Sequence, residues 1–121
     1  MGGRILIADD TSFIRMFQRE ALSAGGYQIV GEAANGREAV EKYRELAPDV
    51  VILDITMPEM NGLEAMQKIL ARDPKARVLI CSAIGQQSLI VEAIKAGARD
   101  FVVKPFKPER LASAIARALL D

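Results

Sequence analysis

Five short runs rich in Val, Ile and Leu alternate with longer segments of helical periodicity, and this alternation constrains the fold more than any other feature. The runs begin near Arg4, Tyr27, Asp49, Arg77 and Arg99. Strands that alternate with helices usually pair in parallel, with the helices as crossovers on the faces of one sheet. The sequence therefore predicts an α/β fold in which a strand–helix unit occurs five times in a doubly wound, five-stranded parallel sheet.

The pattern within each run indicates how its strand is covered. The second run carries Gln28 and Glu32, so it looks like an edge strand. The runs that begin near Asp49, Arg77 and Arg99 are apolar at both alternating positions. Such runs are typical of strands covered by helices on both faces. We therefore expect these three strands to be buried on both sides.

Each intervening segment has an apolar stripe at helical spacing, which must face the sheet. The five stripes are Phe13, Ile14, Phe17, Ala21 and Leu22; Ala39, Val40, Tyr43 and Leu46; Leu63, Met66, Ile69 and Leu70; Leu89, Ile90, Ala93 and Ile94; and Leu111, Ile115, Ala116 and Leu119. Residues that end helices agree with these segments. They are Gly25-Gly26, Pro48-Asp49, Asp73-Pro74 and Gly97.

The length and composition fit one domain that spans residues 1–121. Half of the 121 residues are hydrophobic, which is enough for a core without disulfides. The single cysteine, Cys81, lies in an apolar run and is expected to be buried, which suits a reducing cytoplasm. No segment is long and apolar enough to span a bilayer, and the start of the chain does not resemble a signal peptide. We expect a soluble, cytoplasmic protein.

The charge balance and the lack of histidine exclude several classes of function. Lys plus Arg and Asp plus Glu each number 16, so the net charge of zero gives no electrostatic signature for nucleic acid or an anionic membrane. A chain without histidine cannot carry a Ser-His-Asp or Cys-His nucleophile or an ordinary zinc site. Its chemistry must use carboxylates, hydroxyls, lysine and a metal ion, and its partners are expected to be proteins or small anions.

Charged residues directly follow three of the apolar runs. Asp9 and Asp10 follow the first run, Asp54 follows Val50-Val51-Ile52-Leu53 and Lys104 follows the fifth run. Ligands bind outside the carboxyl ends of parallel strands, so these side chains are expected to converge there. Three adjacent carboxylates repel one another unless a divalent cation and the lysine ammonium neutralise them. The sequence predicts a Mg²⁺ site, because hard cations prefer oxygen ligands.

The same residues also have ordinary structural interpretations. Asp9 and Asp10 could cap the following helix, but two adjacent acids with a third at another strand end exceed what a cap requires. Ser82 could bond its own backbone, whereas its place at the end of the fourth run would let it donate to an oxyanion. Lys104 could be a solvated surface charge. Phe101 is compatible both with a core residue and with a side chain that moves.

With these residues identified, the chain closely resembles the receiver domains of bacterial two-component response regulators, particularly the single-domain chemotaxis regulators. The resemblance covers essentially the whole chain. The motifs in the family's order and spacing are Asp9-Asp10, Asp54 with Met57-Pro58 and Gly62, Ser82-Ala83, Phe101 and Lys104-Pro105. The resemblance implies a flavodoxin-like fold with strand order 2-1-3-4-5 and a cis peptide bond before Pro105. Many members have tyrosine at position 101, so a switch through a phenolic hydroxyl is not implied.

The resemblance also implies a role for each site residue. The phosphoryl acceptor is Asp54. The Mg²⁺ ligands are Asp10, Asp54 and the main-chain carbonyl of Thr56, with Asp9 holding a metal-bound water. The contacts to the phosphoryl oxygens come from Ser82 and Lys104, and the switch residues are Ser82 and Phe101.

The implied function is a phosphorylation-activated switch and not an enzyme, apart from Mg²⁺-dependent self-phosphorylation and autodephosphorylation. A separate histidine kinase of the CheA type would supply the phosphoryl group. The implied output is binding to the flagellar motor switch protein through the fourth helix, the fifth strand and the fifth helix. A phosphatase is a further implied partner, and the protein is expected to be a monomer.

Three alternatives remain open. The same site would serve a phosphorelay carrier or a receiver isolated from a larger regulator, including a DNA-binding one. A Mg²⁺-dependent phosphatase with an aspartyl-phosphate intermediate would need an acid at position 56, where this chain has Thr56. A flavodoxin-type electron carrier would share the strand order, but the sequence lacks aromatic-rich loops that could stack on a flavin.

Overall fold

The computed structural model describes residues 3–120, in which strands and helices alternate throughout. The strands are β1 (Arg4–Ala8), β2 (Gln28–Ala33), β3 (Val50–Asp54), β4 (Val78–Ser82) and β5 (Asp100–Val103). The helices are α1 (Ser12–Ala24), α2 (Gly36–Leu46), α3 (Gly62–Arg72), α4 (Gln87–Ala96) and α5 (Pro108–Ala118). The predicted elements and helix ends are confirmed. The predicted range 1–121 also includes Met1, Gly2 and Asp121, which lie outside the described residues.

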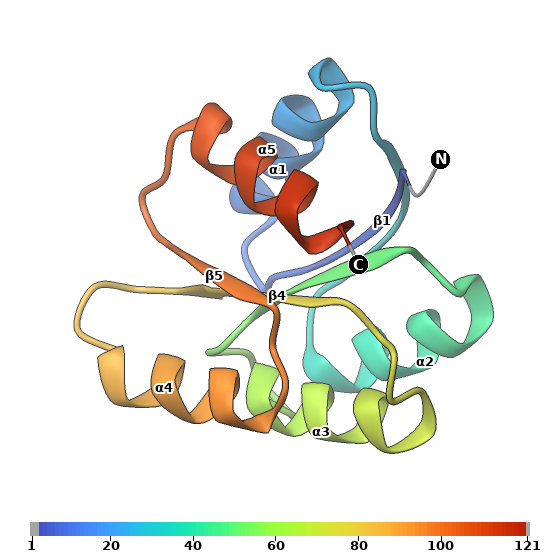
Figure 1. The fold of residues 1–121 in the computed structure, drawn as a ribbon, viewed down its shortest axis with the longest axis vertical. Coiled ribbons are helices and arrows are strands. Elements are labelled where there is room, and N and C mark those ends of the chain that lie inside the picture. Colours follow the sequence, from blue (N-terminus) through green and yellow to red (C-terminus); the bar gives the residue numbers. More distant parts are fainter. Residues whose placement is uncertain (1–2, 121) are drawn as a thin grey trace.

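The five strands form one parallel sheet in the order β2-β1-β3-β4-β5, which confirms the predicted fold and strand order. Figure 1 shows α1 and α5 on one face of the sheet and α2, α3 and α4 on the other. Asp54 in β3 lies opposite Cys81 in β4, so the two strands reach the same edge of the sheet. The loops that follow β1, β3, β4 and β5 therefore gather at that edge.

A separate apolar core fills each side of the sheet. Ile5, Ile52 and Leu79 pack towards α1 and α5, whereas Leu6 and Leu53 pack towards α2, α3 and α4. This alternation along each strand is expected because successive side chains point to opposite faces. Cys81 is fully buried, as predicted, and belongs to the core beneath α1 and α5.

Several predicted core positions are wrong. Phe13 and Ile94 are 66% and 41% exposed, and Ala116 is also exposed. In α1 the polar Gln18 is fully buried together with the predicted Leu22, whereas Ile14, Phe17 and Ala21 are half-buried. Tertiary packing selects which part of a broad apolar face is covered, so single stripe positions in α1, α4 and α5 stay exposed.

The prediction that β5 is covered on both faces is also wrong. β5 is the second edge of the sheet, and its Phe101 and Val103 are only half-buried. The two residues line a groove between β5 and α4. This groove explains why these apolar side chains are not fully buried. β2 forms the opposite edge, as predicted.

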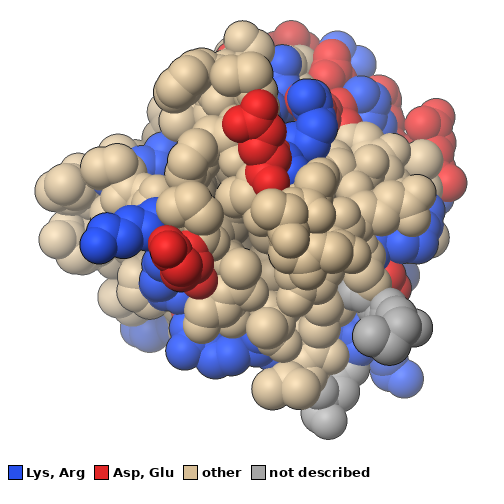
Figure 2. Space-filling model, turned by 90° about the horizontal axis from the view of Figure 1, so that it is seen from above, with Lys and Arg blue, Asp and Glu red and all other residues tan. Residues whose placement is uncertain are grey.

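The distribution of charge on the surface and the length of the helices fit the balanced charge and the lack of a long apolar segment in the sequence. On the face that Figure 2 shows, which carries α1 and α5, acidic and basic side chains are interspersed without a large area of one charge. Among the described helices, none has the length and apolar character needed to cross a lipid bilayer.

Candidate functional site

Three carboxylates converge at the edge where β1 and β3 end. Asp9 and Asp10 directly follow β1, and Asp54 is the last residue of β3. Each contributes one oxygen to a group whose members lie within 4.8 Å of one another. Asp9 is fully buried and Asp54 is nearly so, whereas Asp10 is exposed. The predicted acidic cluster is therefore confirmed, with Asp10 on its solvent-exposed side.

Lys104 reaches into this cluster from the loop after β5. Its Nζ lies 2.7 Å from Asp9 Oδ2 and 3.1 Å from Asp54 Oδ2. The Lys104–Pro105 peptide bond is cis, as the resemblance implies. The predicted inward direction of Lys104 is confirmed, and its ammonium ion holds the carboxylates of two different strand ends together.

The electrostatics of the pocket favour protonation of Asp54. Burial raises the pKa of this carboxyl from 3.8 to about 6, with a further contribution from the negative charge of Asp9. Lys104 opposes this increase without cancelling it. For Lys104, burial alone would lower the pKa, but the contacts with Asp9 and Asp54 raise it above its ordinary value. The Lys104 ammonium thus offsets only part of the cost of burying the Asp54 carboxylate beside Asp9.

Two hydrogen bonds surround Asp9. The Thr11 N–H donates to Asp9 Oδ1 at 2.9 Å in a local turn, but the N-cap of α1 is Thr11 and no side chain caps the helix, so the capping interpretation of Asp9 and Asp10 is wrong. The Arg15 guanidinium donates to the Asp9 carbonyl at 2.6 Å and pairs with Glu32 at 3.0 Å. Sequence reasoning missed Arg15, because an arginine on a helix is usually a solvated surface charge.

A close backbone approach fixes the other side of the pocket. The Gly62 N–H donates to the Ile55 carbonyl at 2.9 Å, and a Cβ at position 62 would lie 2.3 Å from the Asp54 carbonyl oxygen. Only glycine allows α3 to begin this near the acid. The helix itself starts with a capping box, in which Asn61 and Glu64 each accept from the other's backbone N–H.

Ser82 and Thr56 lie next to the acidic cluster in sequence and topology. Ser82 ends β4 one residue beyond the partner of Asp54, and its buried hydroxyl has no hydrogen-bond partner among residues 3–120. This hydroxyl can therefore donate to an oxygen that arrives beside Asp54. The Thr56 N–H donates a long hydrogen bond of 3.4 Å to Asp54 Oδ1.

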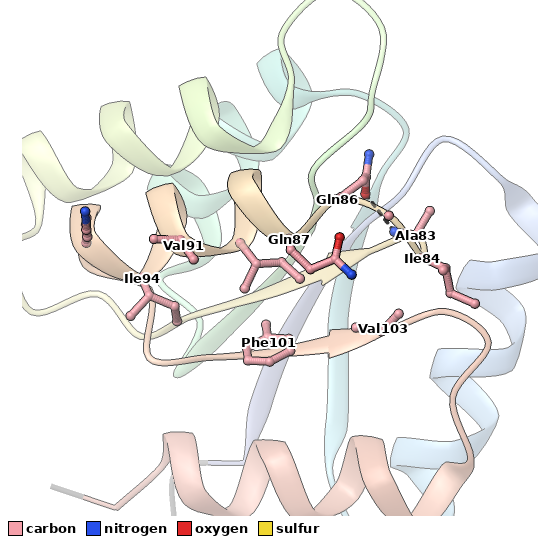
Figure 3. Close-up of a pocket in the computed structure, with 11 residues that line it drawn as sticks. Ala83, Ile84, Gln86, Gln87, Val91, Ile94, Phe101 and Val103 are labelled. Carbon is pink, nitrogen blue, oxygen red and sulfur yellow. Dashed lines mark hydrogen bonds between the residues drawn. The ribbon is translucent and has the colours of Figure 1, made fainter.

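Phe101 lies away from the acids. It lines a groove of about 660 Å³ between α4 and β5, together with Ile90, Val91 and Ile94. Figure 3 shows Phe101 on the strand side of this groove and Val91 and Ile94 on the helix side. Phe101 is therefore half-buried, which fits neither a fully buried core residue nor a fully exposed side chain.

Gln86 is a second residue that sequence reasoning missed. Its side chain joins the loop after β4 to the loop after β3, through Ala83 and Thr56. No periodicity or motif marks a glutamine as a bridge between loops, so only the folded geometry identifies it.

The donor set fits a Mg²⁺ ion. Carboxylate oxygens are its preferred protein ligands, and two oxygens on opposite sides of one ion lie about 4.2 Å apart. The oxygens of the acidic group lie within 4.8 Å of one another, a separation compatible with ligands of one cation, whose charge would also offset that of the carboxylates. Asp9, Asp10 and Asp54 are the side chains available for such an ion.

The sequence was compared with those of known proteins. Residues 5–116 match the response regulator receiver domain family. The chemotaxis protein CheY of Thermotoga maritima is 56% identical over 115 residues, covering 95% of this chain and 96% of its own. CheY of Bacillus subtilis is 51% identical over 119 residues, covering 98% of this chain and 99% of its own.

A comparison with solved structures leads to the same family. A chain in the crystal structure of the CheX-CheY-BeF3-Mg²⁺ complex from Borrelia burgdorferi superposes with a TM-score of 0.93 and 33% sequence identity. The match covers 98% of this chain and 90% of that one. Together with the sequence match and the converging strand-end acids, this similarity shows that the chain belongs to the response regulator receiver domain family.

Proposed function

We propose that this protein is a chemotaxis response regulator, activated when Asp54 accepts a phosphoryl group from a separate histidine kinase. The observation that carries the proposal is the buried Asp54 carboxylate, held 3.1 Å from the Lys104 ammonium and beside two more acids. A buried acid in this setting can present an oxygen to phosphorus while a lysine and a cation neutralise the incoming charge.

The phosphoryl transfer requires one bond to form and one to break. An Asp54 oxygen attacks phosphorus, and the bond from phosphorus to the donor breaks as the donor atom takes the electron pair. A phosphohistidine donor leaves as a neutral imidazole when its ring holds one proton, either already on the other ring nitrogen or taken up from water. Mg²⁺ would supply charge neutralisation at the phosphoryl oxygens, with Asp10, Asp54 and the Thr56 carbonyl as ligands and Asp9 holding a bound water.

Two groups of the chain would bind the transferred phosphoryl oxygens. The Ser82 hydroxyl has no hydrogen-bond partner within residues 3–120 and can donate to an oxygen on Asp54. The Lys104 ammonium already contacts Asp54 and would move its bond to the phosphoryl group. These two new bonds would draw the loops after β4 and β5 inwards, which is the physical basis proposed for the switch.

The proposed output is a chemotaxis signal to a flagellar motor switch protein. Its support is the high identity to two CheY proteins along nearly the whole chain. The proposed contact surface is formed by α4, β5 and α5, where the groove beside Phe101 offers an apolar site that loop movement can reshape. A kinase of the CheA type and a phosphatase are the other proposed partners, in the cytoplasm.

Intact-mass spectrometry tests the phosphorylation chemistry. The protein is incubated with acetyl phosphate and either Mg²⁺ or EDTA, and the mass is expected to rise by one phosphoryl group with Mg²⁺ alone. Lys104→Met should lower the yield strongly, whereas Glu20→Gln, an exposed acid on α1 outside the site, should leave it unchanged. Repeated turnover of a simple phosphate ester would instead indicate a phosphatase.

A second assay separates the chemotaxis output from a phosphorelay carrier or an isolated receiver. A segment of a motor switch protein is titrated with the protein in its free form and with beryllofluoride and Mg²⁺, which imitate the phosphoryl group. Chemotaxis signalling predicts tighter binding with beryllofluoride. Equal binding in both forms would contradict that output and favour transfer to another protein.

A further inference from the structure

The Gln86 side chain connects the two loops that border the acidic pocket. Its Oε1 accepts a hydrogen bond from the Ala83 N–H at 2.7 Å, and its Nε2 donates to Thr56 Oγ1 at 2.9 Å. Figure 3 shows the bond to Ala83 as a dashed line. Ala83 directly follows Ser82, and Thr56 lies two residues after Asp54. We call this pair of hydrogen bonds the Gln86 bridge.

Gln86 is also the N-cap residue of α4, but its side chain forms the bridge and does not cap the helix. Gln86 is the residue before α4, and its carbonyl accepts from the Leu89 and Ile90 N–H groups at 3.0 Å. Its side chain makes no capping bond to the helix. The preceding Gly85 has φ +94°, which lets the chain turn back so that Gln86 reaches Ala83. One residue therefore fixes both the start of α4 and the two loops.

The position of α4 depends on this anchor because its packing against β5 is incomplete. The groove of about 660 Å³ separates Ile90, Val91 and Ile94 on α4 from Phe101 on β5. Val91 is 52% exposed. Ile90 and Ala93 pack into the core, but the open groove leaves α4 with little support on its β5 side. The Gln86 bridge at the start of α4 therefore adjoins the surface proposed for output.

A phosphoryl group on Asp54 would compete with the Gln86 side chain for the Ala83 N–H. It adds oxygens at the edge of the sheet where β4 leads into Ala83, and such oxygens are stabilised by N–H donors. The Ala83 N–H is already occupied by Gln86. The new oxygens can use that donor only when the glutamine releases it.

We propose that Gln86 is a positioning residue that holds the receiver in its resting conformation by occupying the Ala83 N–H, and that phosphorylation displaces it. The inference rests on the proposed function, because it requires a phosphoryl group on Asp54. Release of the Gln86 side chain frees the Ala83 N–H and the hydroxyl of Thr56 at the same time. The resting state is thereby stabilised by a contact that the phosphorylated state must break.

Beryllofluoride affinity in the presence of Mg²⁺ provides the test. Gln86→Ala removes the competitor, so it should bind beryllofluoride about 3- to 10-fold more tightly, the range expected for one net hydrogen bond. Gln87→Ala, a change at the exposed neighbouring residue, should bind like the parent. Thr56→Val removes one end of the bridge and should give a smaller increase. The double variant should match Gln86→Ala, because the two changes disrupt one unit.

Hydrogen exchange of the Ala83 amide gives a second readout that does not depend on activity. Ala83 is exposed, so its amide should exchange faster in Gln86→Ala than in the parent when no beryllofluoride is present. Unchanged exchange, unchanged or weaker beryllofluoride binding by Gln86→Ala, or additive effects with Thr56→Val would overturn the inference. A parent protein that binds no beryllofluoride would refute the proposed function as well, which distinguishes the two failures.

Discussion

Replacing Asp54 with asparagine is expected to stabilise the metal-free protein, and the gain should grow with pH. The folded-state pKa of Asp54 is raised from 3.8 to about 6 by burial and by Asp9. The folded protein therefore binds more protons than the unfolded chain between these two values, and the free energy of unfolding falls as the pH rises through that range. The asparagine side chain has no ionisable group, so the variant avoids this loss.

The magnitude follows from the pKa increase. A change from 3.8 to about 6 corresponds to at most about 3 kcal/mol at a pH above 7. The pocket is open on the Asp10 side, so solvent screens part of the interaction. The variant also gives up the charged contact between Asp54 and Lys104. We expect a net gain of about 1 to 2 kcal/mol at pH 7.5 and almost none at pH 4.

Urea unfolding followed by circular dichroism measures this difference at pH 4, 5, 6 and 7.5 with EDTA present. Glu20→Gln is the control, because it removes the same unit of charge at an exposed position outside the site. Mg²⁺ should narrow the difference at pH 7.5, because the cation binds the parent more tightly than the variant. A gain that is equal at pH 4 and pH 7.5, or a less stable variant, would refute the electrostatic reasoning.

Three further changes test other parts of the structure. Asp10→Asn should weaken Mg²⁺ binding in calorimetric titration by roughly tenfold or more, because affinity follows the charge of the ligands, and unchanged affinity would exclude it as a ligand. Gln18→Leu should raise the free energy of unfolding by about 1 kcal/mol, because it removes a buried Oε1 without a partner among residues 3–120, and a loss of stability would show that its contact with Cys81 matters more. Gly62→Ala should destabilise the fold by about 1 to 3 kcal/mol or more in urea unfolding, because its Cβ would lie 2.3 Å from the Asp54 carbonyl oxygen, and parental stability would contradict the close approach.

The order of the elements could be predicted because it depends on local patterns. Each apolar run is bounded by charged or turn residues, and Gly25 and Gly97 directly follow α1 and α4. The convergence of Asp9, Asp54 and Lys104 was also predictable, because parallel strands place their carboxyl ends at one edge. These inferences need only the direction of the strands and the residues at their ends.

Features that depend on how the helices pack against the sheet could not be predicted from the sequence. Gln18 is fully buried and Phe13 is exposed, although the sequence favours the reverse, because tertiary packing decides which positions beside the apolar stripe of α1 are covered. Phe101 is half-buried because α4 leaves a groove beside β5, and that separation is not encoded in either segment alone. The Gln86 bridge joins loops about 30 residues apart through a polar side chain that has no distinctive sequence context.

Chemical trapping of the phosphorylated residue tests the central claim most directly. The protein is treated with acetyl phosphate and Mg²⁺ and then with borohydride, which reduces an aspartyl phosphate to homoserine, and the modified residue is located by peptide sequencing in a mass spectrometer. We predict homoserine at position 54 and aspartate retained at positions 9 and 10. Homoserine at position 9 or 10, or none at all in a protein that has gained a phosphoryl group, would contradict the assignment of Asp54 as the acceptor.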